Sequence, residues 1–247
     1  TAVGIHISDK SSVGTITNSG LITTTTVDDD ALGIYVEDTS TVGTITNSGT
    51  ITASAGVDTA YGIFVDTTSS VGTITNSGTI TASAGGSDAY GIFVDTSSVG
   101  TITNSGTITA SAGRDTAFGI FVSNSTVGTI TNSGTISASV GENDAVGIIV
   151  SAVEDDEIGS TVDTITNSGT ITASAGRNRA YGIFVNKQTS SVGTITNSGT
   201  ITVSAGKDDA YGIIVDTDST VGTITNSGTI TASAGEDDAY GIIVDTT

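Results

Sequence analysis

The chain has few residues of the kinds that usually perform catalysis. His6 is the single histidine, and the absence of cysteine excludes a thiol nucleophile. A catalytic histidine needs an orienting partner and a nucleophile within reach, and no local motif around His6 supplies both. His6 also occupies a repeat position that holds Phe, Tyr or Ile elsewhere. We therefore expect no enzymatic activity, no catalytic residue, and a structural position for His6.

Carboxylates are the most abundant reactive groups, and they recur along the chain without gathering in one place. There are 26 Asp and Glu residues against 6 Lys and Arg, so the formal net charge is −20. This charge repels phosphate backbones and anionic headgroups, which argues against binding to nucleic acid or to membrane surfaces. No apolar run approaches the roughly 18 residues of a membrane span. We expect no membrane insertion.

The recurring acids suggest calcium as the one ion to consider. Like charges stacked at about 4.7 Å repel unless they are hydrated, screened or bridged by cations, and oxygen-rich corners suit Ca²⁺. The calcium candidates are Asp58, Asp88, Asp208, Asp209, Asp237 and Asp238. A second acidic column comprises Asp38, Asp66, Asp95, Asp216 and Asp245. The glycine-rich nonapeptide of calcium β-rolls is missing, so a solvated acidic edge is the simpler interpretation. No other cofactor is expected.

These residues are carried by an internal repeat with the motif Ile-Thr-Asn-Ser-Gly. The Asn of the motif recurs at intervals of 29, 29, 28, 28, 35, 30 and 29 residues. The positions are Asn18, Asn47, Asn76, Asn104, Asn132, Asn167, Asn197 and Asn226. The long interval contains residues 152–159 with four consecutive acids, which indicates a loop insertion that a solenoid tolerates. Residues 1–247 are expected to form a single repeat array.

Each repeat contains three runs that alternate apolar and polar residues. In one copy they span residues 72–75, 79–84 and 89–94, separated by Asn-Ser-Gly and by a Gly/Asp-rich corner. Alternation bounded by turn residues is typical of β-strands, and the absence of proline suits strands that are paired on both sides. The prediction is an all-β fold, a parallel β-solenoid with three strands per coil and about eight coils of 28–30 residues.

The alternation also predicts which side chains face the interior of the coil. Ile74, Ile80 and Ile92 should point inward, as should Ala82, Ala84 and Val94, with the neighbouring Thr residues outward. The place of Tyr90 is left open because Gly91 can bend its strand. The Asn residues of the motif should stack and hydrogen-bond along the axis in an amide ladder.

Two outward columns suggest functions. One is apolar and comprises Tyr35, Phe64, Phe93, Phe121 and Phe184, with Ile in other copies. Contiguous apolar surface usually marks an interaction site, although burial through another register remains an alternative. The other column is the Thr-x-Thr pair of each repeat, such as Thr73 and Thr75. Such a grid is similar to the faces of ice-binding solenoids, yet Thr also simply suits exposed strand positions.

The alternation of Ile-Thr-Asn-Ser-Gly-Thr-Ile with Ala-Tyr-Gly-Ile-Phe-Val resembles the β-helical passenger repeats of bacterial autotransporters and related surface proteins. The resemblance extends from Thr1 to Thr247. It implies export and display outside a bacterial cell, as an adhesin, stalk or surface layer. No catalytic motif is carried over with it.

Both ends of the chain match the third strand of the repeat, at residues 1–7 and 239–244. Open β-edges invite pairing with another chain, and a head-to-tail contact that does not close produces a filament. The chain is either an excerpt from a longer array or a unit that stacks on itself. We expect an extracellular, filament-forming or fibrous surface protein whose partner is itself, head to tail and laterally. The alternatives are an ice-binding solenoid and a calcium-stabilised spacer.

Overall fold

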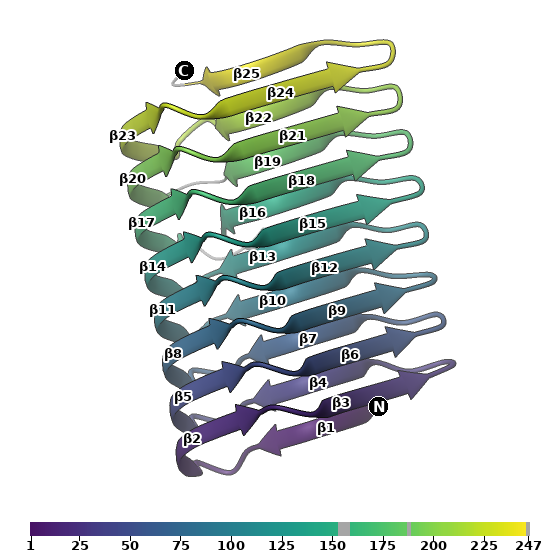
Figure 1. The fold of residues 1–247 in the computed structure, drawn as a ribbon, viewed down its shortest axis with the longest axis vertical. Coiled ribbons are helices and arrows are strands. Elements are labelled where there is room, and N and C mark those ends of the chain that lie inside the picture. The colour runs from purple at the N-terminus through teal and green to yellow at the C-terminus, as the bar shows by residue number, and fades with distance from the viewer. Residues whose placement is uncertain (153–158, 187–188, 246–247) are drawn as a thin grey trace.

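The computed structural model describes residues 1–152, 159–186 and 189–245, and it shows a stack of flat coils (Figure 1). Strands are the only regular secondary structure among the described residues. Each strand pairs in parallel with the strand three positions further along the chain. The protein is therefore a parallel β-solenoid with three strands per coil, which confirms the fold predicted from the repeat. None of the described residues belongs to a helix with the length and hydropathy that crossing a membrane requires.

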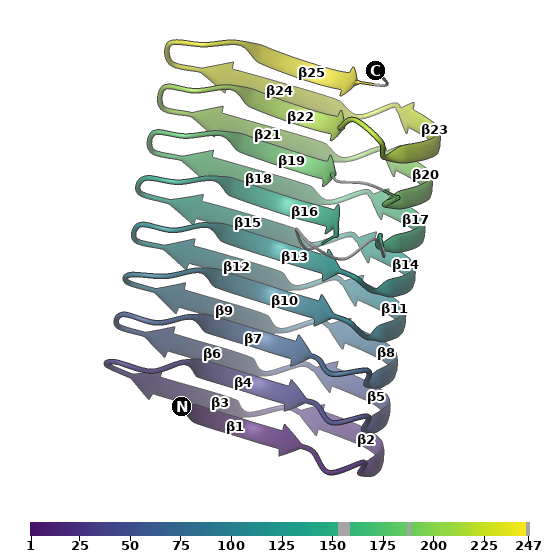
Figure 2. The same cartoon turned by 180° about the vertical axis from the view of Figure 1, so that it is seen from behind.

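Three β-sheets, A, B and C, form the walls of the solenoid, and the strands within each sheet are parallel (Figures 1 and 2). Sheet A contains β1 (Ala2–Ile7), β4 (Ala31–Val36), β7 (Ala60–Val65), β10 (Ala89–Asp95), β13 (Ala117–Ser123), β16 (Ala145–Ser151), β19 (Ala180–Val185), β22 (Ala210–Val215) and β25 (Ala239–Val244). Sheet B contains β2 (Ser12–Asn18), β5 (Thr41–Asn47), β8 (Ser70–Asn76), β11 (Ser98–Asn104), β14 (Thr126–Asn132), β17 (Thr161–Asn167), β20 (Ser191–Asn197) and β23 (Thr220–Asn226). Sheet C contains β3 (Leu21–Thr26), β6 (Thr50–Ala55), β9 (Thr79–Ala84), β12 (Thr107–Ala112), β15 (Thr135–Val140), β18 (Thr170–Ala175), β21 (Thr200–Ala205) and β24 (Thr229–Ala234).

The register joins equivalent positions of successive repeats. Ile92 of β10 pairs with Ile63 on one side and with Ile120 on the other. The long interval in the repeat leaves this register intact, because Asn132 pairs directly with Asn167. The predicted insertion at residues 152–159 falls between β16 and β17, and its residues 153–158 lie outside the described part of the chain.

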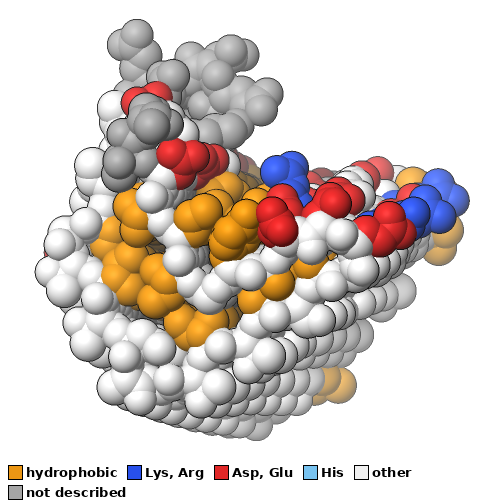
Figure 3. Space-filling model, turned by 90° about the horizontal axis from the view of Figure 1, so that it is seen from above, with side chains coloured by type: hydrophobic (Ala, Val, Ile, Leu, Met, Phe, Trp, Pro, Cys, Tyr) orange, Lys and Arg blue, Asp and Glu red, His pale blue; other side chains and the backbone are white. Residues whose placement is uncertain are grey.

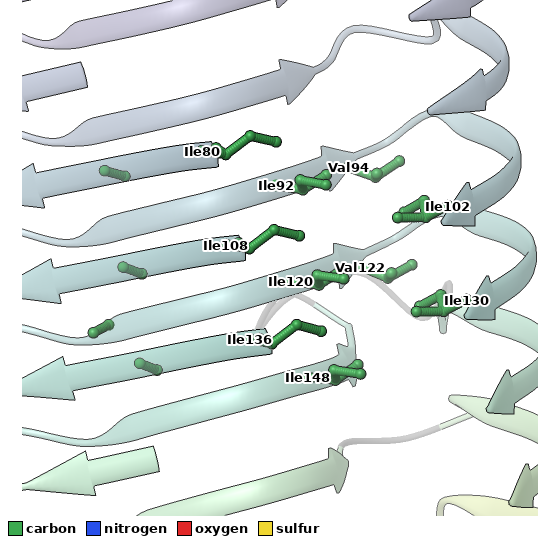
Figure 4. Packing of buried hydrophobic residues seen from close by; sticks show 14 of the residues in the cluster. Ile80, Ile92, Val94, Ile102, Ile108, Ile120, Val122, Ile130, Ile136 and Ile148 are labelled. Carbon is green, nitrogen blue, oxygen red and sulfur yellow. The ribbon is translucent and has the colours of Figure 1, made fainter. Parts of the chain in front are cut away.

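A narrow apolar core runs along the axis between the three sheets. Ile74, Ile80 and Ile92 have no exposed surface, as the alternation predicts. Their equivalents lie above and below them, so each coil covers the apolar side chains of the next (Figure 4). Seen along the axis, hydrophobic side chains fill the space enclosed by the walls (Figure 3). Burying each Ile side chain contributes about 1.5–3 kcal/mol, and stacking makes this possible in a chain that has few large apolar residues.

Each sheet A strand bends at its central glycine, and this interrupts the alternation. In β10, Ala89, Ile92 and Val94 are fully buried. A Cβ on Gly91 would lie 2.3 Å from Ile108 Cγ2, so this position also faces the core. Two successive inward positions place Tyr90 and Phe93 together on the outer face, where their rings stack. Tyr90, whose place the sequence left open, therefore lies outside the main core.

Candidate functional site

The Asn residues at the corner between sheets B and C form one continuous column. Asn76 Nδ2 donates to Asn104 Oδ1 at 2.8 Å, and Asn104 Nδ2 donates to Asn132 Oδ1 at the same distance. From Asn18 to Asn167, each amide also donates to a backbone carbonyl of the following coil, as Asn104 Nδ2 does to Thr135 O at 3.0 Å. All the side-chain bonds run in one direction, from the earlier coil to the later one. The side chains in the middle of the array have no exposed surface, so this amide ladder lies inside the wall.

A second polar column, which the sequence analysis did not identify, lies at the corner between sheets A and B. Its members are Ser11, Ser40, Ser69, Ser97, Ser125, Ser160, Ser190 and Ser219. The backbone N–H of Ser69 donates to Ser97 Oγ at 3.0 Å, and that of Ser97 donates to Ser125 Oγ at 2.9 Å. The signal was present in the sequence, because a serine stands two positions before the inward Val of every repeat. It was missed because a serine in a corner is usually exposed to solvent.

The predicted interaction stripe is a stack of rings on the outer face of sheet A. Phe64 and Phe93 stack with centroids 4.9 Å apart and planes 2° from parallel, and Tyr35 stacks on Phe64 at 5.1 Å. Phe93 and Phe184 are each only 9% exposed, while Tyr35, Phe64 and Phe121 are half-buried. The faces of the rings are covered by their neighbours, so only ring edges are open to a partner. Interaction through this stripe stays a prediction.

A neighbouring column of rings places tyrosine hydroxyls beside the acids of the preceding corner. Tyr90 donates to Asp88 Oδ2 at 2.9 Å, and Tyr211 donates to Asp209 Oδ2 at 2.7 Å. The other carboxylate oxygen of Asp88 accepts the backbone N–H of Thr116 in the next coil at 2.7 Å. These carboxylates therefore link adjacent coils, which is a structural role that the sequence pattern did not reveal.

The calcium candidates are thus divided between two environments. Asp88 and Asp209 use their oxygens in the hydrogen bonds just described, and Asp238 accepts the hydroxyl of Tyr240 at 2.9 Å. The others occupy the adjoining column at the same corner; they are Asp58, Asp208 and Asp237. Among the described residues, no group of three or more His, Cys, Asp or Glu side chains is arranged to hold a metal ion. A calcium site at these residues stays a prediction.

His6 has an orienting partner that the sequence did not suggest. Its Nε2 lies 2.6 Å from Glu37 Oε1, and its ring stacks on Tyr35 with centroids 5.2 Å apart. Tyr35 donates its hydroxyl to Glu37 Oε2 at 2.6 Å. Glu37 follows His6 by 31 positions and lies one coil further along, so only the winding of the chain brings the three side chains together. Catalysis by this group stays untested, and the sequence predicts none.

Burial changes the titration of the carboxylates that link the coils. Desolvation raises the pKa of Asp88 above its usual value, and it does the same for Asp144, which accepts the backbone N–H of Arg179 in the next coil at 2.9 Å. It also raises the pKa of the Tyr61 hydroxyl to about 12. Protonation of Asp88 and Asp144 is therefore easier in the folded chain than in the unfolded one, although hydrogen bonds from Thr116 and Arg179 oppose the shift.

We expect stability to increase on mild acidification. For a carboxyl whose pKa is raised on folding, the contribution to stability is complete below the unfolded pKa near 3.9 and is lost as the pH rises through the folded value. Neutralising part of the −20 charge acts in the same direction. Thermal unfolding midpoints between pH 4 and pH 8 at constant ionic strength should rise toward pH 4. The rise should be smaller in Asp88→Asn, and a midpoint that falls steadily below pH 7 would contradict the prediction.

The outward Thr residues of sheet B lie in register. Thr73 pairs with Thr44 and Thr101, and Thr75 pairs with Thr46 and Thr103. The same pairing continues through every strand of this sheet from β2 to β23. Neighbouring parallel strands lie about 4.8 Å apart. The two columns therefore form a regular grid of methyl and hydroxyl groups on one face.

The last coil differs from the inner coils because nothing among the described residues covers it. Ile242 and Val244 of β25 are 44% and 51% exposed, while the equivalent Ile213 has no exposed surface. Asn226 is also exposed, and its Nδ2 donates to Gly228 O at 3.3 Å without a ladder partner above it. Figure 3 looks onto this end of the molecule.

Comparison with known proteins gives no match: no family model, no curated sequence and no solved structure corresponds to this chain. Functional inference therefore depends on the geometry of the solenoid.

Proposed function

We propose that this protein is an extracellular structural repeat protein whose solenoids associate end to end into a fibrous assembly. The observation that carries the proposal is the unbroken register of equivalent positions from coil to coil, which a second copy would continue on the last described coil, where core residues such as Ile242 are partly exposed. The repeat resemblance to bacterial surface proteins and the absence of cysteine support a place outside a bacterial cell. The partner is a second copy of the chain.

The two ends offer complementary groups to such a partner. Asn226 presents an amide donor along the axis, and Asn18 Oδ1 at the other end accepts only the backbone N–H of Gly20 among the described contacts. A bond between Asn226 and Asn18 of the next copy would continue the amide ladder in its existing direction. The backbone N–H and C=O groups on the open edges of the first and last described coils could pair with each other in the same way.

The strand count restricts how two copies join. Among the described residues, sheet A has nine strands and sheets B and C have eight each. Because successive strands of the chain belong to sheets A, B and C in turn, a strand that followed β25 would join sheet B and pair with β23. If β2 of the next copy takes that place, its β1 coincides with β25. A junction in which all three sheets are continuous therefore requires one of these two strands to move aside.

A charge placed inside the open coil tests the proposal. Ile230 of β24 points inward and packs against the core, so Ile230→Lys should block stacking, because an inward charge protects a β-edge. Thr231→Lys places the same charge on the outward face of the same strand and is the control. Sedimentation velocity and negative-stain electron microscopy at increasing concentration should show elongated assemblies for the parent and for Thr231→Lys. Single solenoids in all three samples would refute the proposal.

The Thr grid of sheet B supports a second candidate, an ice-binding surface. The observation in its favour is the continuous register of the Thr pairs from β2 to β23. Thr pairs also occur on sheet C, for example Thr79 and Thr81, which fits a general preference for Thr at exposed strand positions. A measurement of thermal hysteresis separates the two explanations, and its absence would remove ice binding.

A further inference from the structure

Three successive strands of sheet A, β19, β22 and β25, carry a tyrosine at the same position on the outer face. Tyr181 pairs with Tyr211, and Tyr211 pairs with Tyr240. The rings of Tyr211 and Tyr240 stack with centroids 5.4 Å apart and planes 9° from parallel. Because these two rings are in register and nearly parallel, each ortho carbon of one ring lies next to its counterpart in the adjacent coil. The stack therefore holds two phenols with their reactive carbons side by side.

Each of these two hydroxyls already has a base that can receive its proton. Tyr211 donates to Asp209 Oδ2 at 2.7 Å, and Tyr240 donates to Asp238 Oδ2 at 2.9 Å. A phenol that loses an electron becomes strongly acidic, so a hydrogen-bonded carboxylate takes the proton as the electron leaves. Both tyrosines are half-buried, and their ring edges are open to an oxidant. The pair can thus form tyrosyl radicals without a change in its contacts.

The composition of residues 1–247 directs oxidation to the tyrosines. Cys, Met and Trp, the side chains that are oxidised most readily, are all absent, whereas six tyrosines are present. These residues therefore cannot link their coils through disulfides. Coupling between stacked tyrosines offers a covalent link of another kind.

The other stacked tyrosines are less suited to coupling. Tyr61 and Tyr90 stack at 5.1 Å, but Tyr90 is only 8% exposed, and Tyr61 hydrogen-bonds Thr59 in place of a carboxylate. Tyr181 is only 3% exposed, and the guanidinium of Arg179 lies 6.0 Å from its ring centroid. A positive charge beside a ring is attracted to its π-electrons and opposes the removal of one of them. These differences single out the pair in β22 and β25.

We propose that oxidation joins Tyr211 and Tyr240 through a carbon–carbon bond, as a dityrosine crosslink between the coils of β22 and β25. Each tyrosine gives one electron to the oxidant and its hydroxyl proton to the carboxylate beside it. The two radicals couple at their ortho carbons, and the hydrogens on these carbons move as protons to the oxygens when the rings become aromatic again. With hydrogen peroxide as the oxidant, used by a peroxidase, two phenols and one peroxide give the crosslink and two molecules of water.

The crosslink would act as a covalent fastening between neighbouring coils. Tyr211 and Tyr240 lie one full repeat apart in the chain, so a bond between them restricts the unfolded chain and should raise the thermal midpoint, as a disulfide does. The bond forms within one molecule and is independent of end-to-end association.

Mass spectrometry of the full chain tests the crosslink. After treatment with hydrogen peroxide and a haem peroxidase, the chain is denatured and cleaved with trypsin, which releases residues 208–247 after Lys207. This peptide contains Tyr211 and Tyr240 and no other tyrosine, so an internal crosslink lowers its mass by two hydrogen atoms. We expect this loss of mass, dityrosine fluorescence, and a higher thermal midpoint than that of the untreated chain.

Two variants show whether the stacked pair is responsible. Tyr211→Phe keeps a stacked ring but lacks the hydroxyl, so it should abolish both the loss of mass and the rise in midpoint. Tyr35→Phe is the matched control, because Tyr35 also donates its hydroxyl to a carboxylate, that of Glu37, but stacks on His6 and Phe64 and not on another tyrosine. The oxidised Tyr35→Phe chain should behave as the parent does.

An unchanged mass of the peptide 208–247 in the oxidised parent would overturn the crosslink, even if dityrosine fluorescence appears. Dimers on a denaturing gel without the loss of mass would show coupling between molecules and would overturn it as well. Neither result bears on the proposed function, which sedimentation of the untreated chain tests separately.

Discussion

Gly91→Ala should destabilise the solenoid by about 3 kcal/mol or more, at the upper end of the usual cost of overpacking. The new methyl group would lie 2.3 Å from Ile108 Cγ2 and 2.5 Å from the backbone oxygen of Gly119. A side chain could turn away, but the carbonyl belongs to the ladder of the adjacent strand and cannot move without breaking hydrogen bonds. Equilibrium denaturation followed by far-ultraviolet circular dichroism measures the loss.

The chain contains its own control for this substitution. Gly241 occupies the equivalent position in β25, and a Cβ there would meet nothing within 4 Å. Gly241→Ala should therefore change stability by no more than about 0.5 kcal/mol. If both substitutions have the same effect, the loss at Gly91 comes from the alanine itself and not from the contact between coils.

Asn104→Ala should cost about 2–5 kcal/mol, because it interrupts the amide ladder in the middle of the stack. The substitution removes the acceptor of Asn76 Nδ2 and the donor to Asn132 Oδ1, both at 2.8 Å. These groups are buried where water cannot replace the lost amide, and each unsatisfied group costs about 1–3 kcal/mol. Asn104→Asp should be no better, since a carboxylate offers no donor to Asn132.

Asn226→Ala is the control for the ladder. Asn226 is exposed in the last coil, where its side chain accepts from Asn197 and donates to Gly228 O. Solvent can replace these bonds, so we expect a loss of about 1 kcal/mol or less. Denaturation curves for the two variants should differ clearly in midpoint. Coincident curves would mean that the ladder contributes little to stability.

The terminal position of Asn226 also connects stability with the proposed assembly. In a stacked junction, Asn226 would acquire the buried environment that Asn104 has within the chain. Asn226→Ala would then weaken association while changing the stability of the single solenoid only slightly. The same contacts that join coil to coil thus account for the proposed contact between molecules.

The sequence by itself determined the repeat unit, the three strands of each coil and the inward Ile and Val columns. It could do so because period and alternation are local properties: Ile74 and Ile80 face inward wherever a strand alternates. The Asn column followed for a similar reason, since equivalent residues of a regular solenoid must stack. The first strand proved longer than its apolar run, extending from Ser70 to Asn76, because the Asn is itself an inward position.

Only the tertiary structure decided which side chains meet across the coils. The bend at Gly91 puts Tyr90 and Phe93 on one face, although a regular strand would place residues three apart on opposite faces. The burial of the serine column and the pairing of Asp88 with Tyr90 depend on the path of the corners, which alternation does not encode. Asp95 and Ser123 are brought together in the same way, because residues 28 positions apart become neighbours only after the chain has completed a turn.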